Sequence, residues 1–151
     1  MPRFVFELEP VLEQRRRDEQ ARQRALAQLE RERAALENEI RSCQSAINQE
    51  RDDLRDLLAG GATVDLRGAR MQANASLHHM TRAQRAVLRL AGVHQRLTHP
   101  REAQLEATKR RKAVETLRER RFEAWKREQD AAEARELDDL SVMRFGRETM
   151  P

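Results

Sequence analysis

From Leu12 to Leu57, a stripe of mainly apolar positions recurs at steps of three and four without a slip. Steps of three and four keep these residues on one face of an α-helix, whereas a half-buried strand needs strict alternation. Nine of the fourteen positions in the stripe are apolar: it runs Leu12, Arg15, Glu19, Arg22, Leu26, Leu29, Arg33, Leu36, Ile40, Cys43, Ile47, Glu50, Leu54 and Leu57. The spacing predicts a helix over 10–58, about 70 Å long, which needs a partner helix to cover its stripe.

Composition excludes most other architectures. Of the 151 residues, 37% are charged and 3% are aromatic, with no Tyr and one Trp. A compact domain is closer to one quarter charged. Five Gly and four Pro leave few places for turns. These values argue against a sheet, an α/β enzyme fold and a thick core with a deep pocket, and they predict an all-α chain.

The segments on either side of the first predicted helix carry boundary signals. Residues 1–9 form an N-terminal arm in which apolar side chains alternate, and Pro10 suits the first turn of a helix. Gly60-Gly61 suits a helix end, so 59–64 is the predicted turn. Asp65 can cap the next helix.

A second helix is expected to return along the first. Over 65–98 its apolar positions are Leu77, Met80, Val87, Ala91 and Leu97. Pro100 predicts a kink or a fresh start, so 100–140 is either a continuation or a third helix, followed by a tail over 141–151. The short connection favours an antiparallel two-helix coiled coil, an α-helical hairpin forming one elongated module over 1–151, above a parallel homodimer.

Charge and cysteine content narrow the classes of function. Residues 59–100 carry six Arg and one Asp, while both ends mix the two signs. The basic runs 15–17 and 109–112 are flanked by carboxylates and lack interleaved aromatic residues. This pattern is typical of solvated helix faces, so we do not expect nucleic acid as a partner. A lone Cys43 on the stripe reads as a small buried filler in a reducing cytosol.

No catalytic or cofactor motif is found in the sequence. The five glycines form no phosphate-binding loop, and the side chains of His78 and His79 point about 100° apart on a helix, which does not make a metal site. No stretch approaches the ~20 apolar residues that span a bilayer. We therefore expect a cytoplasmic protein that is no enzyme, binds no cofactor or metal and does not insert into a membrane.

Aromatic residues gather near the two ends of the chain. They are Phe4, Phe6, Phe122, Trp125 and Phe145. An antiparallel hairpin brings these ends together. The rings then either cap the end of the coil or anchor a partner, because aromatic side chains contribute large buried areas at interfaces.

Two segments carry a family resemblance. Phe4-Val5-Phe6-Glu7-Leu8-Glu9-Pro10-Val11-Leu12-Glu13-Gln14-Arg15 resembles the opening of the flagellar export protein FliJ family. Lys112–Arg121, followed by Trp125 and by Glu136-Leu137-Asp138-Asp139, resembles the closing helix of that family. The resemblance covers about the first 40 and the last 45 residues, and between them the match is only in being helical.

The resemblance implies a cytosolic, non-enzymatic component of the flagellar type III export machine, at the membrane beneath the flagellum. The family's antiparallel coiled coil is similar to the central stalk of rotary ATPases. Its termini insert into the hexameric export ATPase ring and promote ring assembly and ATP hydrolysis, and it contacts the cytoplasmic domain of the membrane export gate, with export chaperones as further partners. The ring-facing candidates carried over are Phe4, Phe6, Leu8, Leu12, Arg15, Leu117, Arg120, Arg121, Trp125, Leu137 and Asp138.

The sequence departs from the family pattern by having Pro100 and no Tyr in the middle, so no residue is assigned to the gate. Three alternatives remain open at this point. They are the equivalent stalk of a virulence type III secretion system, a helical nucleic-acid-binding protein that uses the basic middle, and a plain scaffold coiled coil.

Overall fold

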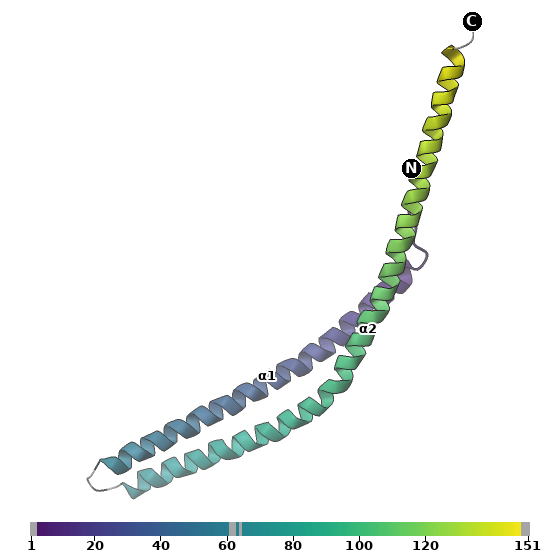
Figure 1. Cartoon of the computed structure of the whole chain (residues 1–151). Coiled ribbons are helices and arrows are strands. Elements are labelled where there is room, and N and C mark those ends of the chain that lie inside the picture. The colour runs from purple at the N-terminus through teal and green to yellow at the C-terminus, as the bar shows by residue number, and fades with distance from the viewer. Residues whose placement is uncertain (1–2, 61–62, 64, 149–151) are drawn as a thin grey trace. The chain divides into compact units, whose positions relative to one another are not determined.

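The computed structural model describes residues 3–60, 63 and 65–148, and it contains two helices. Helix α1 spans Glu9–Ala59 and helix α2 spans Leu66–Glu148 (Figure 1). The described residues contain no strand. The two helices pack against each other as a helical hairpin, which confirms the predicted all-α fold. Residues 1–2 of the predicted arm, 61–62 and 64 of the turn, and 149–151 of the tail lie outside the described residues.

Local signals set the helix ends close to their predicted places. At the start of α1, the Glu9 amide donates to the Phe6 carbonyl at 3.0 Å. The helix ends at Ala59, directly before Gly60. Asp65 caps α2 as predicted: its Oδ1 accepts from the Arg67 amide at 3.1 Å and its carbonyl from the Ala69 amide at 3.0 Å.

Helix α2 passes through Pro100 without a break, so the fresh start and the third helix were wrong. Proline cannot donate to the carbonyl four residues earlier, which weakens one helical turn. Contacts to α1 support the chain on both sides of it. Arg96 Nη2 donates to Glu32 Oε1 at 3.1 Å, and Arg101 Nη2 donates to Glu30 Oε1 at 2.6 Å.

The helix also continues past position 140 to Glu148, where we predicted a tail. The segment after 140 contains no proline before Pro151, and Gly146 alone costs a helix only about 1 kcal/mol. Ser141 keeps its hydroxyl within the helix by donating to the Asp138 carbonyl at 2.7 Å.

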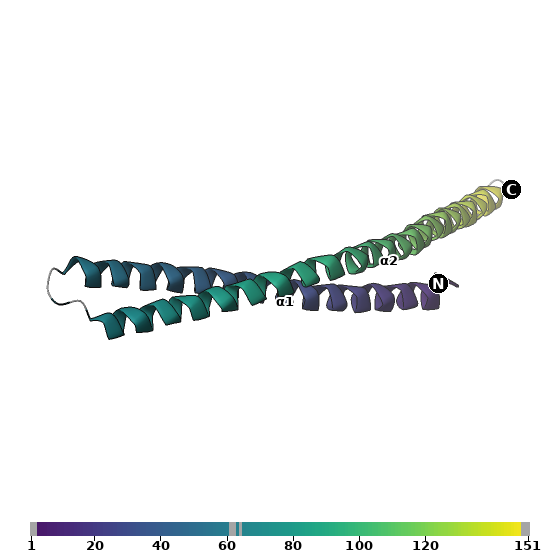
Figure 2. The same ribbon diagram turned by 90° about the horizontal axis from the view of Figure 1, so that it is seen from below.

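Contacts divide the chain into two units. Unit 1 comprises Met1–Gln20 and Leu105–Pro151, and unit 2 comprises Ala21–Gln104. In unit 2 the two helices lie side by side in both views (Figures 1 and 2). Its core consists of Leu36, Ala86, Val93 and Leu97, with Leu26, Leu29, Ile40 and Leu90 packed against them.

The predicted stripe of α1 is the buried one, but of the predicted stripe of α2 Leu97 alone is buried, at 1% exposed. Leu12, Leu36 and Cys43 are all 5% exposed or less. On α2, however, Leu77, Met80 and Val87 are 60%, 47% and 50% exposed. Ala86, Leu90 and Val93 face α1 together with the correctly predicted Leu97.

Helix α2 carries two apolar stripes, and cross-helix charges decide between them. Arg82 Nε and Arg89 Nη2 donate to the two carboxylate oxygens of Glu39 at 2.9 and 3.1 Å. The two arginines flank Ala86 along the helix, so these bonds turn Ala86 toward α1. Ala86 is fully buried, and its small side chain allows a close approach of the helices.

Packing of the unit 2 core gives a direct test of this register. We expect Leu97→Ala to lower the free energy of unfolding by roughly 2–5 kcal/mol, because Leu97 is 1% exposed. The matched change Leu88→Ala, at a side chain 74% exposed, should cost roughly 0.5 kcal/mol or less. Urea unfolding followed by circular dichroism measures both. A loss for Leu88→Ala as large as that for Leu97→Ala would contradict this register.

Candidate partner-binding site

Three aromatic rings in unit 1 join the N-terminal arm to α2. The Phe4 ring meets the Phe122 ring edge-on, with centroids 5.2 Å apart, and lies 5.8 Å from Trp125. Phe122 and Trp125 stack on each other at 5.8 Å. Edge-to-face and stacked pairs at these distances are favourable beyond the area they bury. The arm is therefore attached to α2 by ring contacts at Phe4.

Charged side chains of α2 hold the arm next to this cluster. Phe6 is 6% exposed, and the Arg121 guanidinium lies 5.9 Å from its ring centroid, within cation–π range. Arg121 also faces Glu7, with 3.8 Å between Nη1 and Oε2, and Arg118 Nε donates to Glu9 Oε2 at 2.9 Å. These pairs are exposed, so each adds little stability, but together they orient the arm.

The structure gathers some of the sequence-predicted ring-facing residues and leaves others apart. Phe4, Phe6, Arg121 and Trp125 lie together at the arm. Leu12 is fully buried between the helices, where it supports the pair. The other predicted residues lie partly or fully exposed along the two helices: Leu8, Arg15, Leu117, Arg120, Leu137 and Asp138.

Leu137 and Asp138 belong to a part of α2 against which no helix packs among the residues that the structure describes. Every residue from 130 to 145 is exposed. Within it Leu137, Leu140 and Met143 step by three and are 67%, 60% and 69% exposed. Sequence reasoning missed Leu140 and Met143, although their spacing from Leu137 was the signal. A helical segment of this length is marginal in water alone, and its apolar row is suited to a partner.

A polar network lies between the helices of unit 1. Glu19, 8% exposed, accepts from Thr108 Oγ1 at 2.7 Å and is paired with Arg111. Arg111 also pairs with Glu115, which accepts from Arg16 Nη2 at 3.1 Å. The Thr108 hydrogen bond lowers the pKa of Glu19 most, burial opposes it, and the Arg111 charge lowers it further. Sequence reasoning placed Glu19 on the stripe but did not predict these partners.

In unit 2 the unused stripe of α2 forms an apolar groove with α1. Ile47 of α1 and Met80, Ala83, Gln84, Val87 and Leu88 of α2 line it. Positions 73, 77, 80, 84, 87 and 91 hold no charged residue, which is unusual in a chain that is 37% charged. We call the residues at these positions the uncharged stripe. The structure thus exposes a second surface with the spacing of a coiled-coil seam.

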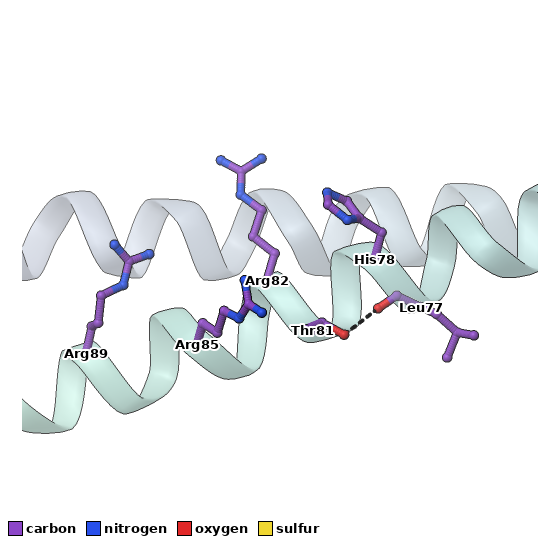
Figure 3. A pocket seen from close by; sticks show the side chains of 6 residues that line it. All are labelled: Leu77, His78, Thr81, Arg82, Arg85 and Arg89. Carbon is purple, nitrogen blue, oxygen red and sulfur yellow. Dashed lines mark hydrogen bonds between the residues drawn. The ribbon is translucent and has the colours of Figure 1, made fainter.

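A basic face runs along α2 beside that stripe. Figure 3 shows His78, Arg82, Arg85 and Arg89 on neighbouring turns, with the Thr81 hydroxyl donating to the Leu77 carbonyl at 2.9 Å. Arg82 and Arg89 are bonded to Glu39, whereas Arg85 has no ion pair within the described residues. Glu39 offsets one of these three guanidinium charges, so this face keeps a net positive charge within the described residues.

The site is suited to binding, through aromatic faces, aliphatic side chains and guanidinium groups. Within residues 3–60, 63 and 65–148, no group of three or more His, Cys, Asp or Glu residues is arranged to hold a metal ion. In the same part of the chain, neither helix offers a stretch long and apolar enough to cross a membrane.

Comparison with known protein families gives a match over nearly the whole chain. A family model described as Flagellar FliJ protein matches residues 4–149. No curated protein and no solved structure matches the chain.

The cross-helix carboxylates predict a loss of stability in acid. Hydrogen bonds from Arg101 and from Arg82 are the main causes that lower the pKa of Glu30 and of Glu39. A lowered folded-state pKa stabilises the fold above the unfolded value, roughly pH 4.3, and this stabilisation is lost as the pH falls through the folded value. We expect the melting temperature to be flat near neutral pH and to drop below about pH 4.3.

The Glu39→Gln variant tests the cause of this drop. It should melt lower than the parent at neutral pH and show a shallower fall in acid, because it has no carboxylate at that position to protonate. Glu128→Gln, at an exposed site of unit 1, is the control and should follow the parent curve. If the melting temperature of Glu39→Gln falls with pH in parallel with that of the parent, Glu39 is not a source of the acid sensitivity.

Proposed function

The chain belongs to the flagellar FliJ family, and from this membership we propose that it is the non-enzymatic stalk of the flagellar type III export apparatus. It acts on the cytoplasmic side of the membrane at the flagellar base. There its unit 1 enters the hexameric ring of the export ATPase. Export chaperones and the cytoplasmic domain of the export gate are its further partners.

The single observation that carries the proposal is the exposed segment 130–145 of α2. It places Leu137, Leu140 and Met143 in one row, next to acidic and basic side chains that meet solvent. Burial of such a row inside a ring removes apolar area from water at about 25 cal/mol per Å². The exposure of Leu137, Leu140 and Met143 on one helical segment supports insertion into another protein.

The aromatic cluster supports the same assignment. Phe122 remains 42% exposed although Phe4 and Trp125 contact it. A half-exposed cluster of rings beside Arg121 has the composition of an interface anchor. The same rings also cap the helix pair. The variant Phe4→Ala with Trp125→Ala separates the capping role from the anchoring role.

An effect on ATP hydrolysis would arise from conformational bias. A ring of identical subunits populates several conformations, and a stalk that binds one of them better shifts the ring toward it. Charged residues around the apolar row allow contacts to several subunits in turn. The chain itself supplies no group to the reaction in this proposal.

For the export gate we propose the uncharged stripe of unit 2 as the contact surface. Met80, Val87 and Leu88 are 47%, 50% and 74% exposed and line one groove with Ile47. A third helix can insert side chains into such a groove between two helices, as in a coiled coil. The apolar groove with heptad spacing favours a helical segment of the gate as the occupant.

Particular observations bear on two of the alternatives. In the basic middle, Arg82 and Arg89 face Glu39 and Arg96 faces Glu32, which leaves less free positive charge for a phosphate backbone and weighs against a nucleic-acid-binding protein. If nucleic acid does bind, its affinity should fall steeply with salt. The virulence-system stalk shares the same physical features, and the neighbouring genes distinguish it from the flagellar one.

Leu137→Ser combined with Leu140→Ser tests entry into the ring. We expect the parent chain to raise ATP turnover by the purified export ATPase and to co-migrate with it, and the double variant to lose both effects. Ala131→Ser combined with Ala134→Ser is the matched control on the same exposed segment and should stimulate as the parent does. A parent chain that neither stimulates nor co-migrates would overturn the proposal.

The variant Phe4→Ala with Trp125→Ala separates anchoring from capping. If the rings anchor the ATPase, helicity stays at the parent value while stimulation is lost. Loss of helicity together with stimulation would assign them to the cap. Circular dichroism and ATP turnover on the same sample give the answer.

Val87→Glu tests the gate contact. We expect it to weaken binding to the gate's cytoplasmic domain by about tenfold or more, because it introduces a charge in the uncharged stripe, while ATPase stimulation remains. Asn74→Glu, on another exposed face of α2, should bind as the parent does. Unchanged gate binding with lost chaperone binding would assign the stripe to chaperones instead.

A further inference from the structure

The apolar groove of unit 2 has an arginine near each of its two edges. On α2, Arg85 precedes Leu88 by one turn, and Leu88 lines the groove. On α1, Arg51 follows Ile47 by one turn, and Ile47 lines the groove from the other helix. Both arginines are exposed. A partner that lies in the groove therefore meets positive charge on both sides.

The carboxylates close to these arginines are already bonded to other side chains. Asp53, two residues after Arg51, accepts from Gln49 Nε2 at 2.8 Å. Glu39 is shared by two other arginines of the basic face. Arg51 and Arg85 thus form no ion pair in the part of the chain that the structure describes, and the uncharged stripe supplies no carboxylate. Two exposed guanidinium groups beside an apolar surface favour an anionic partner.

A hollow on α2 joins the uncharged stripe to the basic face. Leu77 of the stripe and Arg85 of the basic face both line it, together with Thr81 (Figure 3). In coiled coils, long charged side chains beside an apolar seam pair with charges on the facing helix. The Arg85 side chain is therefore placed to reach a carboxylate on a helix that lies along the stripe.

A second copy of this chain is disfavoured as the occupant of the groove. A two-fold contact uses the same surface on both copies. It would bring Arg51 and Arg85 of both hairpins to the edges of one seam, and the stripe has no acidic residue to offset them. Like charges beside a seam select against self-pairing. The charge pattern favours a different chain that carries the opposite sign.

We propose that the groove binds an acidic amphipathic helix. Apolar side chains of that helix, spaced by three and four residues, fill the groove between Ile47 and the uncharged stripe. Its carboxylates pair with Arg51 at one edge and with Arg85 at the other. The inference rests on the proposed function only for the source of this helix, which is the cytoplasmic domain of the export gate.

Two fluorescently labelled peptides of three heptads test the sign of the charge. Both carry leucine at the a and d positions of the heptad, and the flanking e and g positions are glutamate in one and lysine in the other. We expect the parent chain to bind the glutamate peptide about tenfold more tightly, because exposed ion pairs form with it and like charges meet in the other complex. The preference should shrink as salt rises. Fluorescence anisotropy measures both affinities, and equal affinities would overturn the proposal.

Arg51→Glu combined with Arg85→Glu tests whether these two side chains set the preference. Because both are exposed, helicity and melting temperature should match those of the parent. The double variant should bind the lysine peptide more tightly than the glutamate peptide. If it unfolds, Arg51→Gln with Arg85→Gln replaces it, and this neutral pair should bind the two peptides equally. A folded variant of either kind that keeps the parent's preference would overturn the proposal.

Arg24→Glu combined with Arg31→Glu is the matched control. It makes the same change in net charge at exposed positions of α1 in unit 2 that line neither the groove nor the hollow. This control should keep the parent's preference for the glutamate peptide. A reversed preference in the control would show that net charge, and not the edges of the groove, selects the partner, and the proposal would be wrong.

The gate domain and lipid vesicles separate the source of the helix from its chemistry. Arg51→Glu with Arg85→Glu should bind the gate's cytoplasmic domain about tenfold more weakly than the parent does. If the gate domain does not bind the parent while the glutamate peptide does, the gate contact of the proposed function is wrong and the acidic helix stands. Phosphatidylglycerol vesicles that displace the glutamate peptide from the parent would identify an anionic membrane as the occupant and overturn the proposal.

Discussion

The whole structure depends on covering a narrow apolar stripe of α1 with α2. A single helix of this composition cannot bury Leu36 or Cys43, and helices gain most of their stability in proteins from such packing. The core of unit 2 is thin, with Leu36, Ala86, Val93 and Leu97 as its buried members. Because this core is small, the charged residues around it contribute more to which face of α2 packs against α1.

Cross-helix ion pairs make that choice. Glu39 receives Arg82 and Arg89, Glu32 receives Arg96, and Glu30 receives Arg101. Each pair is exposed, so its energy is modest. Together they select which of two apolar stripes of α2 turns inward, and the other stripe stays on the surface of unit 2. The exposed groove is therefore a direct consequence of how the stripe of α1 is covered.

Unit 1 combines a supported part and an unsupported part of the same helix. The rings of Phe4, Phe122 and Trp125 attach the arm, and the buried Glu19 network lies between the helices. From 130 to 145 every residue of α2 is exposed. A surface that binds another protein must be exposed in the free chain. The side chains of Leu137, Leu140 and Met143 are exposed in this way.

The sequence by itself determined the helices, the buried face of α1 and the cap at Asp65, because periodicity and capping are local properties of consecutive residues. It also predicted the meeting of the terminal aromatic rings from the hairpin alone. Only the tertiary structure decided which stripe of α2 faces inward, that Pro100 lies within an unbroken helix, and that Thr108 and Arg111 hold Glu19. Those outcomes depend on contacts between residues about 40–90 positions apart. Local sequence patterns such as periodicity carry no information on such partners.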